Sequence, residues 1–309
     1  MRERALAGAA GLGLSCIAAA GVIALLLHWA GGSLKDWFVP LLHLNWVFAL
    51  LVLCSTGVNL ALTALKWRYV VTRVAGGVPG FRYLEYTTLT ALAGQVLPLH
   101  LVSIVVRPLA MRYHLGWSVQ RGTATTVVDH AYDVLIPALI VFPALLLMSQ
   151  GATLTIQFLG SVAGIAVVPI LVVSLGHFDW KLYCLSALRF ANLALRGVCA
   201  ALALGLDIEF VVLVFATAAL SLSQLLAVTP GGLGVSELGA GFVLVLWAVS
   251  PSVALQFAFG VRVLAFGSVL ACAGVVFLRA LGSGSIEAQQ DSERAASGRP
   301  MNPNGEGGG

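Results

Sequence analysis

Long apolar stretches that are nearly free of charge dominate the sequence and limit what it can fold into. One runs from Ala5 to Trp29, and a second from about Leu41 to Leu65. A helix of about 20 apolar residues crosses the ~30 Å hydrocarbon core of a bilayer. Charged residues make up only 10% of the chain, whereas a soluble domain carries about 25%. The sequence therefore excludes a soluble enzyme and predicts an all-α, polytopic transmembrane helical bundle.

Basic residues between the apolar stretches predict the orientation of the bundle. Lys66 and Arg68 follow the second stretch directly, with Arg73 and Arg82 close behind. Because loops rich in Lys and Arg stay in the cytoplasm, we expect Lys66 and Arg68 at the cytoplasmic interface. An even number of spans then places both termini in the cytoplasm. We expect a multi-pass protein of the cell inner membrane.

The remaining uninterrupted stretches predict further spans. The first stretch is interpreted as an uncleaved span, with a cleaved signal peptide as the alternative, because the apolar core of such a peptide is normally about 7–15 residues long. Lys181, Arg189 and Arg196 are expected at cytoplasmic ends of spans. The later predicted spans are Thr123–Met148, Thr153–Leu175, about Phe190–Leu206, and Val253–Leu278.

Two stretches contain helix breakers. The first, Leu84–Val106, contains Pro98, which removes a backbone donor. If it crossed the membrane, the arginine-rich segment 107–122 would lie outside, so we predict a re-entrant hairpin, with a kinked span as the alternative. The second, residues 210–249, forms either two spans or another re-entrant hairpin. In total the sequence predicts six to eight spans with one or two re-entrant hairpins.

A weak internal repeat relates the two halves of the chain. Three positions are related across 132 residues: Pro98, Ser118 and His130 are followed by Pro230, Ser250 and Arg262, two of them with the same residue. The predicted spans with His130 and Arg262 run in opposite directions, as in the inverted repeats that build midplane sites in transporters. Residues 1–280 form one predicted transmembrane domain. Residues 281–309 are polar and glycine-rich, and we expect a disordered cytoplasmic tail.

Ionisable residues inside the apolar stretches are the candidate functional groups, because each costs ~2.5–3.5 kcal/mol at the centre of a membrane helix. Asp129 and Asp133 are four residues apart and share one helix face. One interpretation is an internal ion pair of Arg262 with Glu237 or Asp129. The other is a polar cavity in which Arg262 holds an anionic head group and the acids hold a cationic group or a proton. The candidates are Arg107, Asp129, His130, Asp133, Glu237 and Arg262.

The second helix break has a composition suited to a ligand site. Pro230 ends the preceding helix, and Gly231, Gly232 and Gly234 permit positive φ angles and the close approach of a ligand or another helix. A helix that restarts near Val235 would direct its N-terminal amides at the break and form an anion site. A tight interhelical turn packed through small residues is the alternative.

Signatures of enzymes are missing from the sequence. It has no GxSxG, HExxH or Walker motif, and its histidines are scattered. We therefore predict a protein that is not an enzyme and that needs neither a cofactor nor a metal. The net charge of +4 lies in short loops, so nucleic acid is not an expected partner.

Taken together, these motifs resemble the transmembrane region of lysylphosphatidylglycerol synthase, a family of flippase-like integral membrane proteins. The resemblance is carried by Leu65–Arg68, Leu97–Pro98 with Arg107 downstream, Asp129–Asp133, and Pro230–Glu237 with Arg262 beyond. The chain departs from the family pattern in two places. Val102-Ser103 stands where a glycine and an acid are usual, and Asp129-His130 stands where an acid and an arginine are usual.

The resemblance implies movement of a lipid with a large or charged head group between leaflets. The implied partner is an anionic or aminoacylated phospholipid, or a hopanoid or isoprenoid-type lipid. A lipid-biosynthesis enzyme is a further expected partner. We expect no synthase domain, because the residues after Arg279 are few and polar. The alternative function is that of a non-catalytic accessory subunit in a lipid or cell-envelope biosynthesis system.

Overall fold

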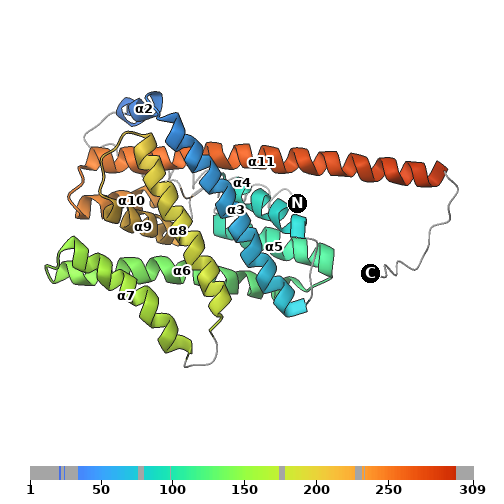
Figure 1. Cartoon of the computed structure of the whole chain (residues 1–309), viewed down its shortest axis with the longest axis horizontal. Helices are drawn as coiled ribbons and strands as arrows, with labels where there is room; N and C mark the ends of the chain where they lie inside the picture. The colour runs from blue at the N-terminus through green and yellow to red at the C-terminus, as the bar shows by residue number, and fades with distance from the viewer. Residues whose placement is uncertain are drawn as a thin grey trace.

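The computed structural model describes residues 21, 24, 34–75, 80–97, 99–173, 178–226, 232 and 234–296. Within these residues the chain forms ten helices and no strand, which confirms the all-α prediction (Figure 1). Most of the first predicted span lies outside the described residues, as do Pro98, Pro230 and Gly231. The helices are α2 (Leu34–Leu42), α3 (Trp46–Ala75), α4 (Gly80–Ala93), α5 (Leu99–Leu115), α6 (Val119–Ser149), α7 (Leu154–Val173), α8 (Trp180–Ala203), α9 (Phe210–Leu226), α10 (Val235–Leu246) and α11 (Pro251–Ala296).

Four helices in the described part of the chain are long and apolar enough to cross a membrane. Three shorter apolar helices accompany them: Leu154–Val167, Phe210–Gln224 and Val235–Leu246. Large apolar side chains such as Leu42, Phe142 and Leu278 are exposed, as expected of a surface that faces lipid. The chain is therefore a polytopic helical membrane protein. The four long segments are Trp46–Val74, Val119–Ser149, Trp180–Ala203 and Pro251–Arg279.

Both interrupted stretches fold as helical hairpins. Helices α4 and α5 are antiparallel, since Tyr86 near the start of α4 hydrogen-bonds through its hydroxyl to Nε2 of His114 at the end of α5, at 2.8 Å. Helices α9 and α10 are antiparallel as well, with Gly239 packed directly against Ser223. The arms have 12 to 17 residues, fewer than the ~20 that a span requires. This geometry matches re-entrant hairpins and excludes a single kinked span over Leu84–Val106.

The predicted inverted repeat is visible in the order and direction of the helices. Each half has a long helix, a hairpin and a second long helix: α3, α4–α5 and α6, then α8, α9–α10 and α11. Helices α3 and α8 pack antiparallel, because the amide of Asn45 donates to the carbonyl of Ala203 at one end and Arg73 pairs with Asp179 at the other. Helices α6 and α11 also run in opposite directions (Figure 1). The two hairpins therefore enter the bundle from opposite faces.

The halves are interlocked by their long helices. Helix α6 packs on α5 of its own hairpin and on α9 of the other, and α11 packs on α10 and on α4. Apolar side chains fill the centre, including Val52, Ile136, Phe215 and Phe257. This arrangement brings the broken ends of both hairpins toward the middle of the bundle, where the candidate functional residues lie.

Two boundaries differ from the sequence predictions. Helix α8 begins at Trp180, about ten residues before the predicted span, because Arg189 and Arg196 face the bundle interior and do not end the helix. Helix α11 continues to Ala296, into the predicted disordered tail, and projects beyond the other helices (Figure 1). Alanine, glutamine and glutamate in its last turns are good helix formers. Residues 297–309 lie outside the described residues, and the disorder predicted there stays a prediction.

Candidate functional site

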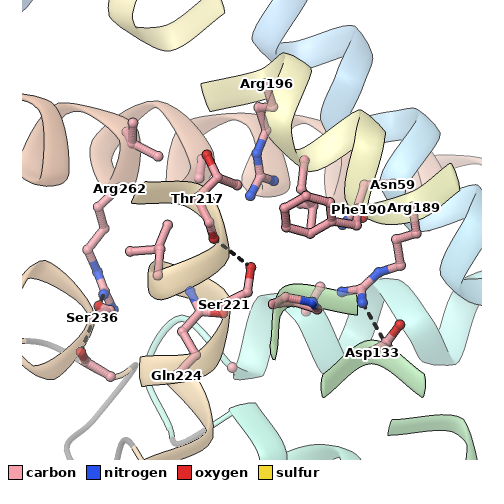
Figure 2. A pocket seen from close by; sticks show the side chains of 18 of the residues that line it. Asn59, Asp133, Arg189, Phe190, Arg196, Thr217, Ser221, Gln224, Ser236 and Arg262 are labelled. Carbon is pink, nitrogen blue, oxygen red and sulfur yellow. Dashed lines mark hydrogen bonds and ion pairs between the residues drawn. The ribbon is translucent and has the colours of Figure 1, made fainter. Parts of the chain in front are cut away.

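A cavity of about 190 Å³ lies between the two halves, at the broken ends of both hairpins (Figure 2). Gly94 and Gln95 of the first break line it, as do Gly232, Ser236 and Glu237 at the second. Helices α3, α4, α6, α8, α9 and α11 supply the rest of its wall. Its described ionisable residues are His130, Asp133, Arg189, Arg196, Glu237 and Arg262.

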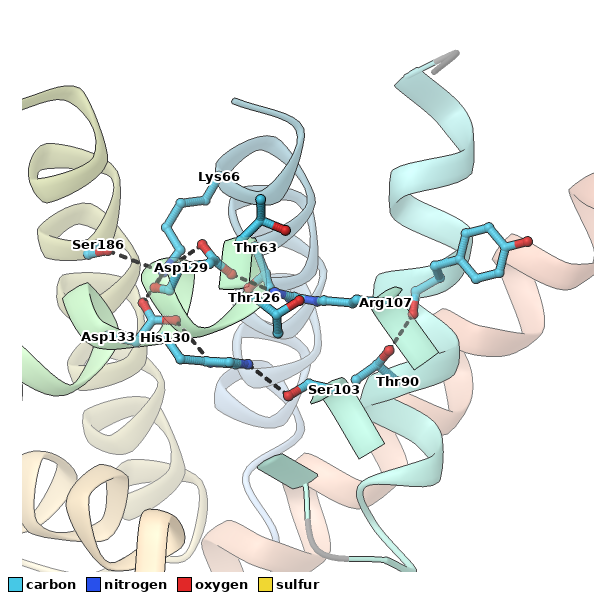
Figure 3. Close-up of polar contacts among 12 residues, drawn as sticks. Thr63, Lys66, Thr90, Ser103, Arg107, Thr126, Asp129, His130, Asp133 and Ser186 are labelled. Carbon is cyan, nitrogen blue, oxygen red and sulfur yellow. Dashed lines mark hydrogen bonds and ion pairs between the residues drawn. The ribbon is translucent and has the colours of Figure 1, made fainter. Parts of the chain in front are cut away.

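Behind one side of the cavity, α6 presents Asp129 and Asp133 on one face, as their spacing predicts (Figure 3). The ammonium of Lys66 from α3 lies 3.2 Å from Oδ1 of Asp129 and also pairs with Asp133. It donates further hydrogen bonds to the carbonyl of Asp129 at 2.9 Å and to the hydroxyl of Ser186 at 3.2 Å. Lys66 thereby ties α3, α6 and α8 together.

Two arginines complete this network. Nη1 of Arg107, on α5, lies 2.5 Å from Oδ2 of Asp129, and its guanidinium lies 5.2 Å from the ring centre of Trp67, a cation–π distance. Nη1 of Arg189, on α8, lies 2.9 Å from Oδ2 of Asp133. Each carboxylate therefore binds two cations, as a buried charge requires.

His130 connects the network to the first hairpin. Its Nε2 hydrogen-bonds to the hydroxyl of Ser103 on α5, at 2.7 Å, and its Nδ1 lies 3.9 Å from Oδ2 of Asp133. Ser103 and His130 are the two positions at which the sequence departs from the resembled pattern. The structure shows that they contact each other, so the two departures belong to one interaction.

Asp129, His130 and Asp133 also have the spacing of a metal site, with one ligand atom from each lying within 4.8 Å of the others. Both carboxylates, however, already bind Lys66, and each binds an arginine as well. Three cations around two acids leave no negative charge for a metal ion to neutralise. The donor set therefore fits an internal ion network better than a metal centre.

On the second half, Arg262 forms an ion pair with Glu237, one of the two acids that the sequence offered as its partner. Nη1 of Arg262 lies 2.8 Å from Oε1 of Glu237 and donates to the hydroxyl of Ser236, also at 2.8 Å. Helix α10 begins at Val235, as predicted, and the amide of Gly234 donates to Oε2 of Glu237 at 2.7 Å. The anion site expected at this helix start is thus occupied by the chain's own carboxylate.

The described glycines of the second break have the backbone conformation that their residue type permits. Gly232 has φ 73° and Gly234 has φ 86°, values that are costly for residues with a Cβ. The carbonyl of Gly232 accepts a hydrogen bond from the hydroxyl of Ser236 at 2.9 Å. The break is therefore held in place by the first turn of α10.

The predicted residues divide into those that line the cavity and those that support it. His130, Asp133, Gly232, Glu237 and Arg262 line it. Arg107 and Asp129 are buried in the network behind its wall, and Gly234 lies at the start of α10. Pro98, Pro230 and Gly231 lie outside the described residues.

The prediction for Lys66 is wrong. Its side chain is fully buried among acids instead of lying at the cytoplasmic interface, because α3 continues past it to Ala75. Arg68, on the opposite side of the same turn, is exposed.

Two cavity residues, Arg189 and Arg196, were expected at the cytoplasmic end of a span. They lie seven residues apart on α8, which places both on one helix face. Ser186 and Leu193 lie on the same face and also line the cavity. This polar stripe at helical spacing is the sequence signal that could have located both arginines.

Comparison with known proteins agrees with the membrane fold. Residues 9–185 match the model of one family, described as the lysylphosphatidylglycerol synthase TM region. The match extends from before α2 to the first turns of α8 and includes Lys66, Arg107, Asp129, His130 and Asp133. No curated protein matches the chain. Since the family model covers more than half of the sequence, the chain belongs to the family of the lysylphosphatidylglycerol synthase transmembrane region.

Proposed function

We propose that this protein moves a lipid with a charged head group between the two leaflets of the membrane. The observation that carries the proposal is the charged cavity between two inverted halves, located where both hairpins are broken. Inverted repeats with broken helices at a central site are the architecture of alternating access in transporters. The head group would occupy the cavity while the acyl chains remain in the surrounding lipid.

The cost of the cavity's charges supports a functional role. Each charged side chain at membrane depth costs ~2.5–3.5 kcal/mol on insertion scales, and the cavity together with the ion network behind its wall contains five cations and three carboxylates. Apolar residues of similar volume would hold the helices together at lower cost. A charged lipid head group could bind these side chains in place of its hydration shell, which would explain why the charges are present. The proposed movement breaks no covalent bond, so we infer that the chain acts as a transporter and not as an enzyme.

The exposed basic side chains support an orientation for this movement. The end of α3 contacts the starts of α6 and α8, through Arg121 to the carbonyl of Val74 and through Arg73 to Asp179. By the positive-inside rule this face lies in the cytoplasm, and we infer an inner-membrane protein whose last span ends inside. The exposed basic residues at the ends of α3 and α5 and the starts of α4, α6 and α8 are Arg68, Arg73, Arg82, Arg112, Arg121 and Lys181.

Proteoliposomes test the proposal. Purified protein is reconstituted with fluorescent phosphatidylglycerol, and the fraction of probe that dithionite quenches over time reports its movement between leaflets. We expect wild type to accelerate movement and Arg262→Ala to abolish it, because Arg262 anchors the second break through Ser236 and Glu237. Arg68→Ala, an exposed arginine change on α3, is the matched control and should transport normally.

The same experiment separates the proposal from the accessory-subunit alternative. Unchanged transport in Arg262→Ala would remove Arg262 from the path. Wild-type protein that moves neither fluorescent phosphatidylglycerol nor fluorescent phosphatidylethanolamine would contradict a transport function. In that case, co-purification of a lipid-biosynthesis enzyme would support the accessory role.

A further inference from the structure

Building on the proposed function, we propose that Arg196 binds the phosphate group of the transported lipid. Arg196 lies on α8 and lines the cavity. In Figure 2 its guanidinium points into the space between the Arg262–Ser236 contact and the Arg189–Asp133 pair. This assignment moves the phosphate site away from Arg262, whose charge Glu237 already neutralises.

Arg196 differs from the other cavity arginines in its partners. Arg189 pairs with Asp133, and Arg262 pairs with Glu237. No carboxylate of the described chain lies within 4.0 Å of the Arg196 guanidinium, and the cavity that it lines also includes Thr217 and Phe190. Thus Arg196 brings a positive charge to the cavity that the described protein does not neutralise.

The matching long helices of the two halves treat a buried basic residue differently. Lys66 lies on α3 and Arg196 on α8, although the two are not at matching positions of the repeat, since the residue 132 positions after Lys66 is Val198. In the first half, Lys66 is neutralised by Asp129 and Asp133 of α6.

The residues 132 positions after these two acids are Val261 and Ala265 of α11, and both line the cavity. The two acids that neutralise Lys66 therefore have apolar counterparts in the second half, on the wall of the cavity that Arg196 also lines.

The overall charge around the cavity agrees with an anionic ligand. Five cations, Lys66, Arg107, Arg189, Arg196 and Arg262, face three carboxylates, Asp129, Asp133 and Glu237, in the described structure. The excess of two positive charges would be costly in a medium of low dielectric constant. A bound anion removes this cost, and the planar guanidinium matches a phosphate with two parallel hydrogen bonds.

Asn59 gives the site a second polar contact. It lines the same cavity from α3, and its buried Oδ1 has no hydrogen-bond partner among the described residues. A buried acceptor of this kind gains a hydrogen bond from a hydroxyl or ammonium donor. The pair of groups suits a phosphate that carries an alcohol or amine substituent, as phospholipid head groups do.

Native mass spectrometry of the purified protein tests the assignment. The probes are dioleoyl phosphatidylglycerol and dioleoylglycerol, which share acyl chains and differ in the phosphoglycerol head group. We expect wild type to retain the phospholipid in preference, and Arg196→Gln to lower that preference about tenfold or more, since hydrogen bonds to charged groups contribute at this level. Arg68→Gln, the same change on an exposed arginine, should retain the wild-type preference.

A second variant tests the same assignment while keeping Arg196 in place. Ala265→Asp places a carboxylate at the repeat position of Asp133 and should pair with Arg196. We expect it to fold as well as wild type and to lose the preference for phosphatidylglycerol about as completely as Arg196→Gln. Full retention of the preference in either folded variant would overturn the assignment.

Two further measurements distinguish free phosphate from phospholipid as the ligand, and failure of the Arg196 site from failure of the proposed transport function. If inorganic phosphate raises the melting temperature of wild type but not of Arg196→Gln, while neither protein prefers the phospholipid, the site binds free phosphate and the lipid assignment is wrong. Fluorescent phosphatidylglycerol transport is measured on the same proteins. Transport by wild type with normal phospholipid preference in Arg196→Gln contradicts only the Arg196 site, whereas absence of wild-type transport contradicts the proposed function itself.

Discussion

The two halves of the molecule share a topology but treat their buried charges differently. In the first half, Asp129 and Asp133 bind three cations between them, and Asp129 is fully buried behind the cavity wall. In the second half, one pair, Glu237 with Arg262, lines the cavity directly, and Arg196 has no acid beside it. The difference indicates that one half uses charge mainly for structure, while the other presents charge to a ligand.

The largest expected effect is in the first half, where each carboxylate already binds two cations. Asp129→Asn removes the carboxylate partner of Arg107 and leaves Lys66 with Asp133 alone, and breaking a buried ion pair costs about 3–5 kcal/mol. We expect a strong loss of folded protein, measured by size-exclusion chromatography and thermal unfolding in detergent. Asp207→Asn, the same change at an exposed position between α8 and α9, is the control. Wild-type stability of Asp129→Asn would show that the network is not structural.

A smaller effect is expected from the matching change in the second half. Glu237→Gln removes the charge that pairs with Arg262 but can still accept from the amide of Gly234, so we expect a loss of about 1.5–3 kcal/mol. Freed from Glu237, Arg262 should also bind anions better, and retention of phosphatidylglycerol should rise. A fall in retention together with normal folding would contradict the proposed division between the halves.

The effect of an added methyl group can be compared between α6 of the first half and α11 of the second half. A Cβ at Gly122 of α6 would lie 2.8 Å from Cα of Pro108 in α5, a backbone atom that cannot move aside. Gly122→Ala should therefore cost about 1–3 kcal/mol by overpacking. Gly267→Ala in α11 meets nothing within 4 Å and should be neutral or stabilising. Thermal unfolding of both variants measures the difference, and equal effects would contradict the close contact of α5 with α6.

The smallest effect concerns the hydrogen bond between Ser103 and His130. Ser103→Ala removes this bond, and we expect a loss of about 1 kcal/mol without a change in lipid preference. Ser236→Ala removes the corresponding contact to Arg262 and should alter lipid preference, because Ser236 itself lines the cavity and Ser103 does not. Lipid retention by native mass spectrometry distinguishes the two, and equal lipid preference in both variants would contradict their separate roles.

The sequence predicted those features that depend on local pattern. The helix restart near Val235 and the shared face of Asp129 and Asp133 follow from local pattern and helical spacing. The cost of isolated charge indicated an acid beside Arg262, but it left Glu237 and Asp129 as alternatives, and the structure shows Glu237. Lys66 and Arg196 were misplaced, because a basic residue next to an apolar run looks the same whether it ends a span or lies inside one. Only tertiary packing, which brings acids of α6 against α3, shows that Lys66 is buried.

The repeat was visible in the sequence as three matching positions, but its consequence required the structure. Val261 and Ala265 are ordinary membrane residues in the sequence. Their meaning appears only when α11 is compared with α6, where aspartates occupy the related positions. The absence of two acids could not be recognised before the two halves were aligned in space.

The most direct test of a ligand-neutralised Arg196 is an electron cryomicroscopy structure of the protein in nanodiscs that contain phosphatidylglycerol. We predict density for a phosphate within hydrogen-bond distance of the Arg196 guanidinium, with the Glu237–Arg262 pair intact. Phosphate density at Arg262 with Glu237 displaced, or a cavity with no lipid density in which Arg196 pairs with an acid of the chain, would contradict the assignment.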